Sequence, residues 1–275
     1  MSLAPQDLFP HLADWVANLD DVFPGRQIKP WFAQWEVGHL ISLIVLGGSS
    51  ILLNLRLIGV GITDETPSEV HRNMRIWMHL GVFGILLTGL LIGSANAERL
   101  YTSQAFSAKM VGLAAGIVLT YAITLPATRN DGQVGMVSRI FGLIGLALFI
   151  LAIWVFLQAK LSNPGLWHVI SAGALVALFA TRGLTRIVYL AGMAIMIAAQ
   201  QVMTHFVIKP DDYAGLDPVN KAFAWAFFVW IGLAAVIQVI QSRDTKSGPY
   251  VKGMAWVSLL VWVLTAAAGR WLAFA

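Results

Sequence analysis

Residues 140–157 read IFGLIGLALFILAIWVFL, eighteen consecutive positions without a charge or a hydrophilic side chain. As a helix this stretch would be about 27 Å long, close to the apolar thickness of a bilayer. The rest of the chain has the same character: of 275 residues, 58% are apolar and 12% are charged, and the mean hydropathy is +0.73. This composition excludes a disordered chain and favours a helical protein with several membrane spans over a soluble globule.

The sequence predicts an all-α transmembrane helical bundle of about eight spans. A spanning helix needs about 20 mostly apolar residues. The stretches that approach or reach this length are Val37–Gly59, Ile76–Ala95, Ala105–Leu125, Ile140–Leu157, Leu166–Ala180, Ile187–Val207, Ala222–Ile240 and Met254–Ala273. Residues 181–186, TRGLTR, predict a tight turn between the fifth and sixth spans. The alternative is one long broken helix through this hexapeptide, which would give seven spans.

The distribution of basic residues predicts the orientation. With eight spans, the loops after the odd-numbered spans carry more Lys and Arg, and fewer acids, than the other side. Because basic residues accumulate on the cytoplasmic side, both termini are expected outside a bacterial inner membrane. Seven spans would place Arg182 and Arg186 in the membrane core, which is costly. Positive loops and lipid headgroup contacts account for the pI of 9.5, so no nucleic-acid partner is expected.

Residues 1–35 form an amphipathic segment before the first span. Apolar side chains recur at helical spacing, with aspartates between them, at Leu8, Leu12, Trp15, Val16, Leu19, Val22 and Phe23. The pattern predicts a helix lying on the outer membrane surface, or a docking face for a partner subunit. The chain is then expected to comprise this segment, a first four-helix half (36–160) and a second four-helix half (161–275).

Several kinds of chemistry are excluded or disfavoured by the composition of the spans. The sequence contains no Cys, which excludes disulfides, thiolate zinc sites, Cys-ligated iron–sulfur clusters and covalently attached haem. Apart from Glu36 at the first boundary, the expected spans contain no Asp or Glu. Proton pumps and ion-coupled carriers usually need an intramembrane carboxylate, so this absence disfavours them.

Three histidines and a lysine are expected at one depth in the outer half of the bundle. His39 and His168 each lie three residues into a span that enters from outside. His205 lies about two residues from the outer end of its span, and Lys109 lies one turn into its own. At a rise of 1.5 Å per residue, all four fall roughly 3–8 Å below the outer boundary.

Such a layer is typical of a b-type haem site. Two neutral imidazoles from different helices would bind the iron, and any two of His39, His168 and His205 satisfy the spacing. Lys109 would neutralise the propionates, unless its side chain simply extends to the interface. Gly47 lies eight residues after His39 on the same helix face and would leave room for the porphyrin edge.

The inner half offers fewer ionisable groups. His79 lies within the second span and would ligate a second, inner haem, for which His71 is a less favoured partner because it precedes the span. Arg56, Arg72 and Arg75 are expected to bind lipid phosphate or haem propionates on this side.

The methionines support an alternative interpretation, a copper path instead of a haem site. Met193, Met196 and Met203 lie near one face of the sixth span, with His205 beyond them, and thioether with imidazole suits Cu(I). Methionine is also common core filler, so the same pattern fits a packed helix. The repeat Gly112-x-x-x-Gly116 predicts close helix packing.

The first half of the chain resembles a known family. The run HLISLIVLGG at 39–48, followed by NLRLIG at 54–59, TGLL at 88–91 and FSAKM at 106–110, resembles the CopD-like integral membrane proteins and their uncharacterised bacterial relatives. Those relatives resemble the di-haem b-type cytochromes. The resemblance covers roughly residues 36–125 and implies a helical bundle with a histidine-ligated haem b, or a role in copper handling. His39, Arg56 and Lys109 are the residues carried over.

These observations predict a membrane-embedded b-type cytochrome that relays electrons between quinol and a redox partner on the outer side. It would act as an electron-transfer subunit of a larger complex, with quinone as a further cofactor. Two alternatives remain: a permease for copper or a small solute, and a non-catalytic membrane scaffold that docks another subunit.

Overall fold

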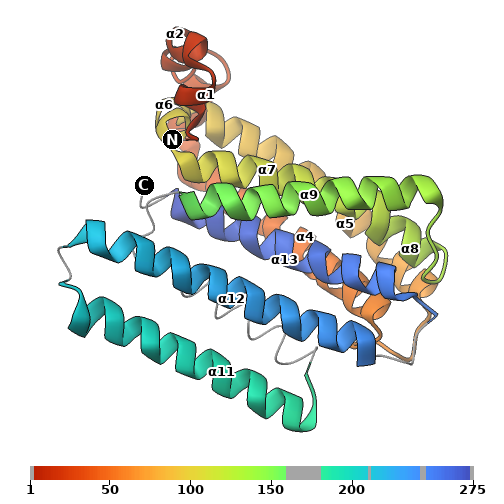
Figure 1. Cartoon of the computed structure of the whole chain (residues 1–275). Helices are drawn as coiled ribbons and strands as arrows, with labels where there is room; N and C mark the ends of the chain where they lie inside the picture. The colour runs from red at the N-terminus through yellow and green to blue at the C-terminus, as the bar shows by residue number, and fades with distance from the viewer. Residues whose placement is uncertain (1–2, 159–180, 210–211, 242–245, 273–275) are drawn as a thin grey trace.

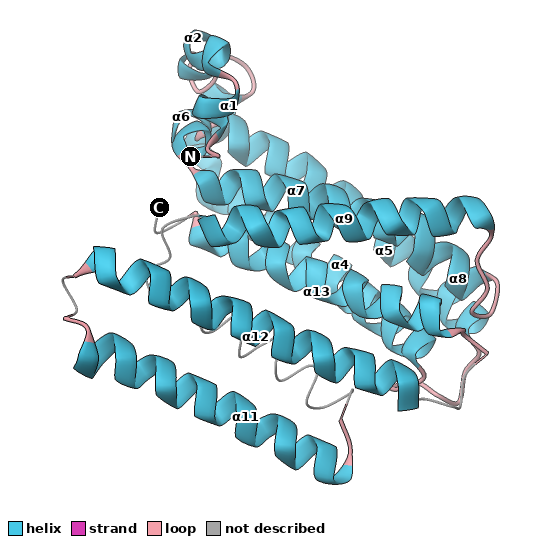
Figure 2. Cartoon of the chain, in the orientation of Figure 1, coloured by secondary structure: helices cyan, strands magenta, loops and turns pink. Residues whose placement is uncertain are grey.

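The computed structural model of the chain describes residues 3–158, 181–209, 212–241 and 246–272, and all regular elements in these ranges are helices (Figure 2). Seven of the helical stretches are long and apolar enough to cross a membrane. They are α4 (Phe32–Ile58), α5 (Pro67–Ser94), α7 (Gln104–Leu119) with η3 (Thr120–Thr124) and α8 (Leu125–Arg129), α9 (Met136–Gln158), α11 (Gly183–Val202) with η4 (Met203–Val207), α12 (Tyr213–Gln241) and α13 (Pro249–Trp271). The prediction of a multi-pass helical membrane protein is confirmed.

Seven of the eight predicted spans overlap these helices, and the expected fifth span, Leu166–Ala180, lies outside the described residues. The predicted turn at 181–186 is shorter than expected. Arg182 has an extended backbone and α11 begins at Gly183, whose φ of +53° suits a residue without a side chain. The last four residues of the hexapeptide therefore belong to α11.

Helix α5 begins nine residues before the predicted span, at Pro67 rather than Ile76. Thr66 and Glu69 form a capping box, in which each side chain accepts a hydrogen bond from the backbone N–H of the other. Pro67 at the first helical position is already fixed at a helical φ. This polar first turn places His71, Arg75 and His79 on one continuous helix.

Helices α4, α5, α7, α9 and α13 pack into one bundle, and α11 and α12 lie as a pair along one side of it (Figure 1). In the most apolar window of α13, 72% of the residues are buried, against 22% for α11, so α13 is central and α11 peripheral. The expected division into residues 36–160 and 161–275 stays a prediction, but the described contacts join α13 to α4, α7 and α9.

Two glycines allow the helix backbones to approach closely. A Cβ at Gly81 of α5 would lie 2.7 Å from the Leu46 Cα of α4, and one at Gly116 of α7 would lie 2.8 Å from the Trp262 Cζ2 of α13. Gly112 faces Thr265 one turn away from Gly116. The predicted packing role of the Gly112–Gly116 repeat is therefore confirmed.

The segment before α4 forms an N-terminal cap (residues 3–31) at one end of the bundle, which we call the cap end (Figure 1). It contains α1 (Pro5–Leu8), η1 (Pro10–Leu12), α2 (Ala13–Ala17), α3 (Gly25–Ile28) and η2 (Lys29–Trp31), which replace the single amphipathic helix that the pattern predicts. Prolines at positions 10, 24 and 30 remove backbone donors and interrupt a continuous helix.

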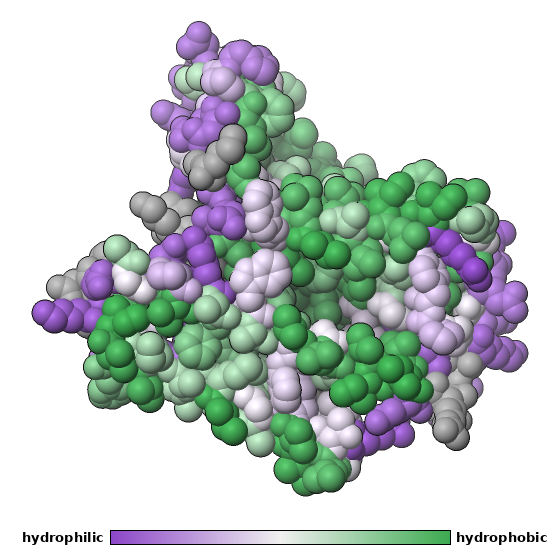
Figure 3. All heavy atoms as spheres, viewed as in Figure 1, coloured by the Kyte–Doolittle hydropathy of each residue, from purple (hydrophilic) through white to green (hydrophobic). Residues whose placement is uncertain are grey.

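The cap rests on α6 (Ala97–Thr102), where the Tyr101 hydroxyl donates to the Phe9 carbonyl at 2.6 Å. Trp15 is 61% exposed and Phe23 is 80% exposed, so the cap presents large apolar side chains outward. In the space-filling view, apolar side chains cover much of the helices, while hydrophilic ones gather on the cap and at the helix ends (Figure 3). This distribution fits a bilayer around the bundle.

The contact at Gly116 gives a first prediction. Gly116→Val should lower the unfolding free energy by about 1–3 kcal/mol, because the new side chain overlaps the Trp262 ring in a packed interface. Thermal unfolding in detergent, followed by tryptophan fluorescence, measures the loss. Gly253→Ala is the control: its Cβ meets nothing within 4 Å and should leave the melting temperature unchanged or higher. Equal melting curves for Gly116→Val and wild type would contradict the close packing.

Candidate functional site

Near the cap end, His39 of α4 is held by Thr88 of α5. The His39 Nδ1 lies 2.8 Å from the Thr88 Oγ1, and the Thr88 hydroxyl donates to the Gly84 carbonyl at 2.5 Å. Because that hydroxyl proton is engaged, the Thr88 oxygen accepts the hydrogen bond and the imidazole carries its proton on Nδ1. The His39 Nε2 then keeps a free lone pair. A ring nitrogen in this state can bind a metal ion.

Lys109 of α7 is close enough to His39 for its charge to act on the imidazole. Its alkyl chain runs against α13, where a Cβ at Gly269 would lie 3.5 Å from the Lys109 Cε. Among the residues that the structure describes, Lys109 makes no hydrogen bond or ion pair. We call His39, Thr88 and Lys109 the His39 group: a half-buried imidazole with a free lone pair next to a half-buried cation.

The other two histidines of the predicted layer are not part of the described His39 group. His205 lies in η4, on an exposed face of a peripheral helix, and its Nδ1 donates to the Gln201 carbonyl at 3.1 Å. His168 lies outside the described residues. The sequence therefore predicted the proximity of His39 and Lys109, whereas it did not reveal the outward direction of His205 or the role of Thr88.

Inside the bundle, toward the end opposite the cap, four buried polar residues form the Asn54 network: Ser50, Asn54, Thr124 and Ser258. The Asn54 Nδ2 donates to the Ser50 carbonyl at 2.9 Å and lies 3.4 Å from the Ser258 hydroxyl. The Thr124 hydroxyl lies 3.0 Å from the Asn54 Oδ1 and 3.1 Å from the Ser258 hydroxyl. The network thus joins α4, η3 and α13 with hydrogen bonds that are sheltered from water.

At the end opposite the cap, α5 and α8 line an open surface groove of about 370 Å³, which we call the basic groove. Its lining residues are His71, Arg75, His79, Tyr121, Leu125, Pro126, Arg129 and Asn130. The first three recur every four residues and share one face of α5. The others come from η3 and α8 and the loop residue that follows.

The histidines of the basic groove are oriented by hydroxyl groups. The His71 Nδ1 lies 3.1 Å from the Thr128 Oγ1, whose own proton is engaged by the Thr124 carbonyl at 2.7 Å. The His79 Nδ1 lies 3.0 Å from the Tyr121 hydroxyl, and the two rings stack at 5.6 Å between centroids. Arg56 is elsewhere: its Nε donates to the Glu65 carbonyl.

The basic groove does not suit the predicted inner haem. His71 and His79 lie on one face of the same helix, so both imidazoles would approach a porphyrin from the same side. No histidine from another described helix lines this pocket. In the described ranges, no group of three or more His, Asp or Glu side chains could hold a metal ion. Met193, which belongs to the proposed copper path, is packed in the hydrophobic core.

A second pocket, the apolar groove, has a volume of about 480 Å³ and lies between α9, α12 and α13. Its lining is mostly aliphatic and aromatic, but Gln200 and Asn220 lie in it, joined by a hydrogen bond of 3.2 Å. The Gln200 Oε1 is buried and has no hydrogen-bond partner among the described residues. A pocket of this size and polarity can hold an amphipathic small molecule that donates one hydrogen bond.

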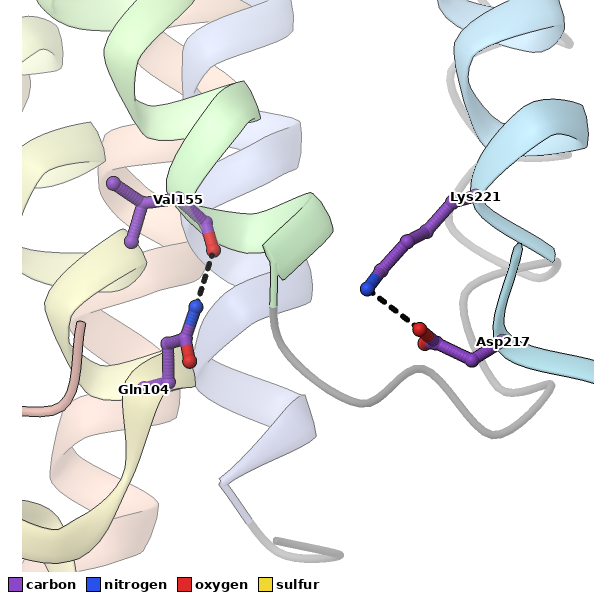
Figure 4. Close-up of polar contacts among 4 residues, drawn as sticks. All are labelled: Gln104, Val155, Asp217 and Lys221. Atoms are coloured by element: carbon purple, nitrogen blue, oxygen red, sulfur yellow. Dashed lines mark hydrogen bonds and ion pairs between the residues drawn. The ribbon is translucent and has the colours of Figure 1, made fainter. Parts of the chain in front are cut away.

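Two further polar contacts lie near the cap end, and neither belongs to the sites described above. Gln104 of α7 donates to the Val155 carbonyl of α9 at 3.4 Å, and Lys221 forms an ion pair with Asp217 at 2.6 Å, one turn away on α12 (Figure 4). The Lys221 charge is thus balanced within its own helix, in contrast to Lys109.

The fold defines a multi-pass helical membrane protein whose polar side chains gather in the His39 group, the Asn54 network and the basic groove. The chain belongs to a family of unknown function, DUF6644, whose family model matches residues 26–171. The matched range contains the His39 group and every residue of the basic groove. No curated protein and no solved structure matches the chain.

The Asn54 network gives a second prediction. Asn54→Ala should lower the unfolding free energy by about 1–3 kcal/mol, because buried hydroxyl groups lose their partner in a region that water cannot reach. The melting temperature in detergent reports the change. Asn73→Ala, at an exposed position of the α5 helix, should leave it unchanged. If both variants melted like the wild type, the network would not stabilise the bundle.

Proposed function

We propose that this protein is a membrane-embedded b-type cytochrome in which His39 is one axial ligand of the haem. The observation that carries the proposal is the hydrogen-bond chain from His39 Nδ1 through the Thr88 hydroxyl to the Gly84 carbonyl, which leaves the His39 Nε2 lone pair free. Histidines that bind metals usually donate their other ring N–H to such a second partner. The resemblance to the CopD-like proteins, which also includes Lys109, points in the same direction.

The surroundings of His39 fit a haem b in two further respects. Lys109 supplies an unbalanced positive charge that can pair with a propionate. A Cβ at Gly47, on the same face as His39, would meet no atom within 4 Å, so the helix surface there is open. The opposite axial position is assigned to His168, because the other histidine expected at this depth, His205, is exposed on a peripheral helix.

In this proposal the chain's own residues orient and tune the cofactor. When bound, haem supplies one-electron transfer, and its potential depends on the ligands and the hydrogen bonds around them. Thr88 fixes the ring orientation of His39 by accepting its Nδ1–H, and Lys109 favours the ionised propionate. The apolar helices around the site exclude water.

The apolar groove is the proposed site for quinol, the electron donor. A quinol is a flat, largely apolar molecule with two hydroxyl donors, and the buried Gln200 Oε1 has no partner from the described chain. It can therefore accept a hydrogen bond from a hydroxyl, while aromatic and aliphatic side chains contact the ring and tail. The exposed Trp15 and Phe23 of the cap would face a redox partner on the outer side of a bacterial inner membrane, with both termini outside.

A reduced-minus-oxidised visible spectrum of the purified protein tests the function directly. We expect a b-type α-band in the wild type, its loss in His39→Ala and in His168→Ala, and its retention in His205→Ala. His11→Ala, in the exposed cap, is the matched control and should keep the full band. A featureless wild-type spectrum after haem-supplemented expression, or full haem in His39→Ala, would refute the proposal.

Thr88 gives a more specific prediction. Thr88→Val removes the acceptor for the His39 Nδ1–H while keeping the shape of the side chain, so haem affinity should fall about 10–100-fold. The midpoint potential should rise, because an imidazole without this hydrogen bond donates less electron density to the iron. Haem titration and potentiometry measure both. Thr88→Ser retains the hydroxyl and should restore wild-type values; if it behaved like Thr88→Val, the hydroxyl would not be the cause.

A further inference from the structure

The basic groove holds two arginines whose charges are not balanced by the described chain. Arg75 and Arg129 make no hydrogen bond or ion pair in the described ranges. No acidic residue lines the pocket, and the neighbouring Asp131 instead accepts a hydrogen bond from the backbone N–H of Ser68 at 3.0 Å. Two unpaired guanidinium groups with neighbouring imidazoles favour an anionic ligand over a neutral one.

The remaining lining residues add hydrogen-bond donors and a fixed shape. Tyr121 and Asn130 carry a hydroxyl and an amide at the pocket wall, and Pro126 and Leu125 close it on the α8 side. His71 and His79 are held by Thr128 and Tyr121, so the α5 side is also ordered. Guanidinium groups present paired N–H donors that match the oxygens of a phosphate, which makes phosphate the best-fitting anion.

The position of the groove identifies the source of that phosphate. It lies where α5 begins and α8 ends, so its arginines are near the level of the lipid headgroups. His79 and Tyr121 lie further along the same helices, and Tyr121 is 43% exposed on the bundle surface. Beyond them on α5, Leu80 and Phe83 are also exposed, which offers an apolar surface for acyl chains.

We propose that the basic groove binds the phosphate of an anionic phospholipid, which enters sideways from the adjacent leaflet. Arg75 and Arg129 contact the phosphate oxygens, and Asn130 donates to the headgroup. The acyl chains lie along the exposed apolar residues of α5. This site is separate from the His39 group and does not depend on haem binding.

Lipid titration of the purified, detergent-solubilised full chain, followed by native mass spectrometry, tests the proposal. The probes are phosphatidylglycerol and phosphatidylcholine of the same acyl composition. We expect the wild type to bind phosphatidylglycerol about tenfold more tightly or better, because two basic residues near the surface favour an anionic lipid. The double variant Arg75→Gln/Arg129→Gln should lose this preference, whereas Arg75→Lys/Arg129→Lys should retain part of it.

Arg139→Gln is the matched control. Arg139 lies in the first turn of α9, does not line the groove, and sits over the Tyr250 ring at 5.9 Å from its centroid. It should bind phosphatidylglycerol like the wild type. Equal affinity of the wild type for the two lipids, or an unchanged preference in the double glutamine variant, would overturn the proposal. Displacement of the lipid by millimolar inorganic phosphate would assign the groove to a soluble anion and overturn the lipid assignment. Each single variant, Arg75→Gln and Arg129→Gln, is measured separately in case the double variant does not fold.

Discussion

The amide of Asn54 joins three helices at a depth where water is absent. In hydrocarbon, a polar group without a protein partner costs several kcal/mol, so the contacts among Asn54, Thr124 and Ser258 strongly restrict how α4, η3 and α13 can be placed. The glycines of α7 lie on the same interface and let α13 approach. The central position of α13, the last helix in the sequence, follows from this combination of polar partners and small residues.

The spans were predictable because each one needs about 20 consecutive apolar residues to cross the bilayer, and such a stretch is visible in the local sequence. The start of α5 was not, since its first turn is polar and is stabilised by capping instead of burial. The packing of α13 against α4 and α7 could not be predicted from the sequence either. It depends on contacts between residues about 200 positions apart, such as Asn54 and Ser258.

In the candidate sites, too, the sequence predicted some features and not others. Counting residues along a span gives the depth of a side chain, and this placed His39 and Lys109 at one level. Depth does not give the direction in which the side chain points around the helix axis, and His205 proved to be exposed on a peripheral helix. The basic groove was missed as a unit because the predicted third span ended at Leu125, four residues before Arg129, whereas the helix continues through Pro126 to Arg129.

The π-helical turn at Thr120–Thr124 has a consequence for how this protein can change during evolution. One extra residue in a helix rotates everything beyond it by about 100° relative to a regular α-helix. In this chain the turn lets Thr124 face Asn54 while Tyr121 and Arg129 line the basic groove. A single-residue deletion here would restore a regular helix but turn the later side chains away from their partners. Substitutions in this segment should therefore be tolerated in related sequences far more readily than changes in its length.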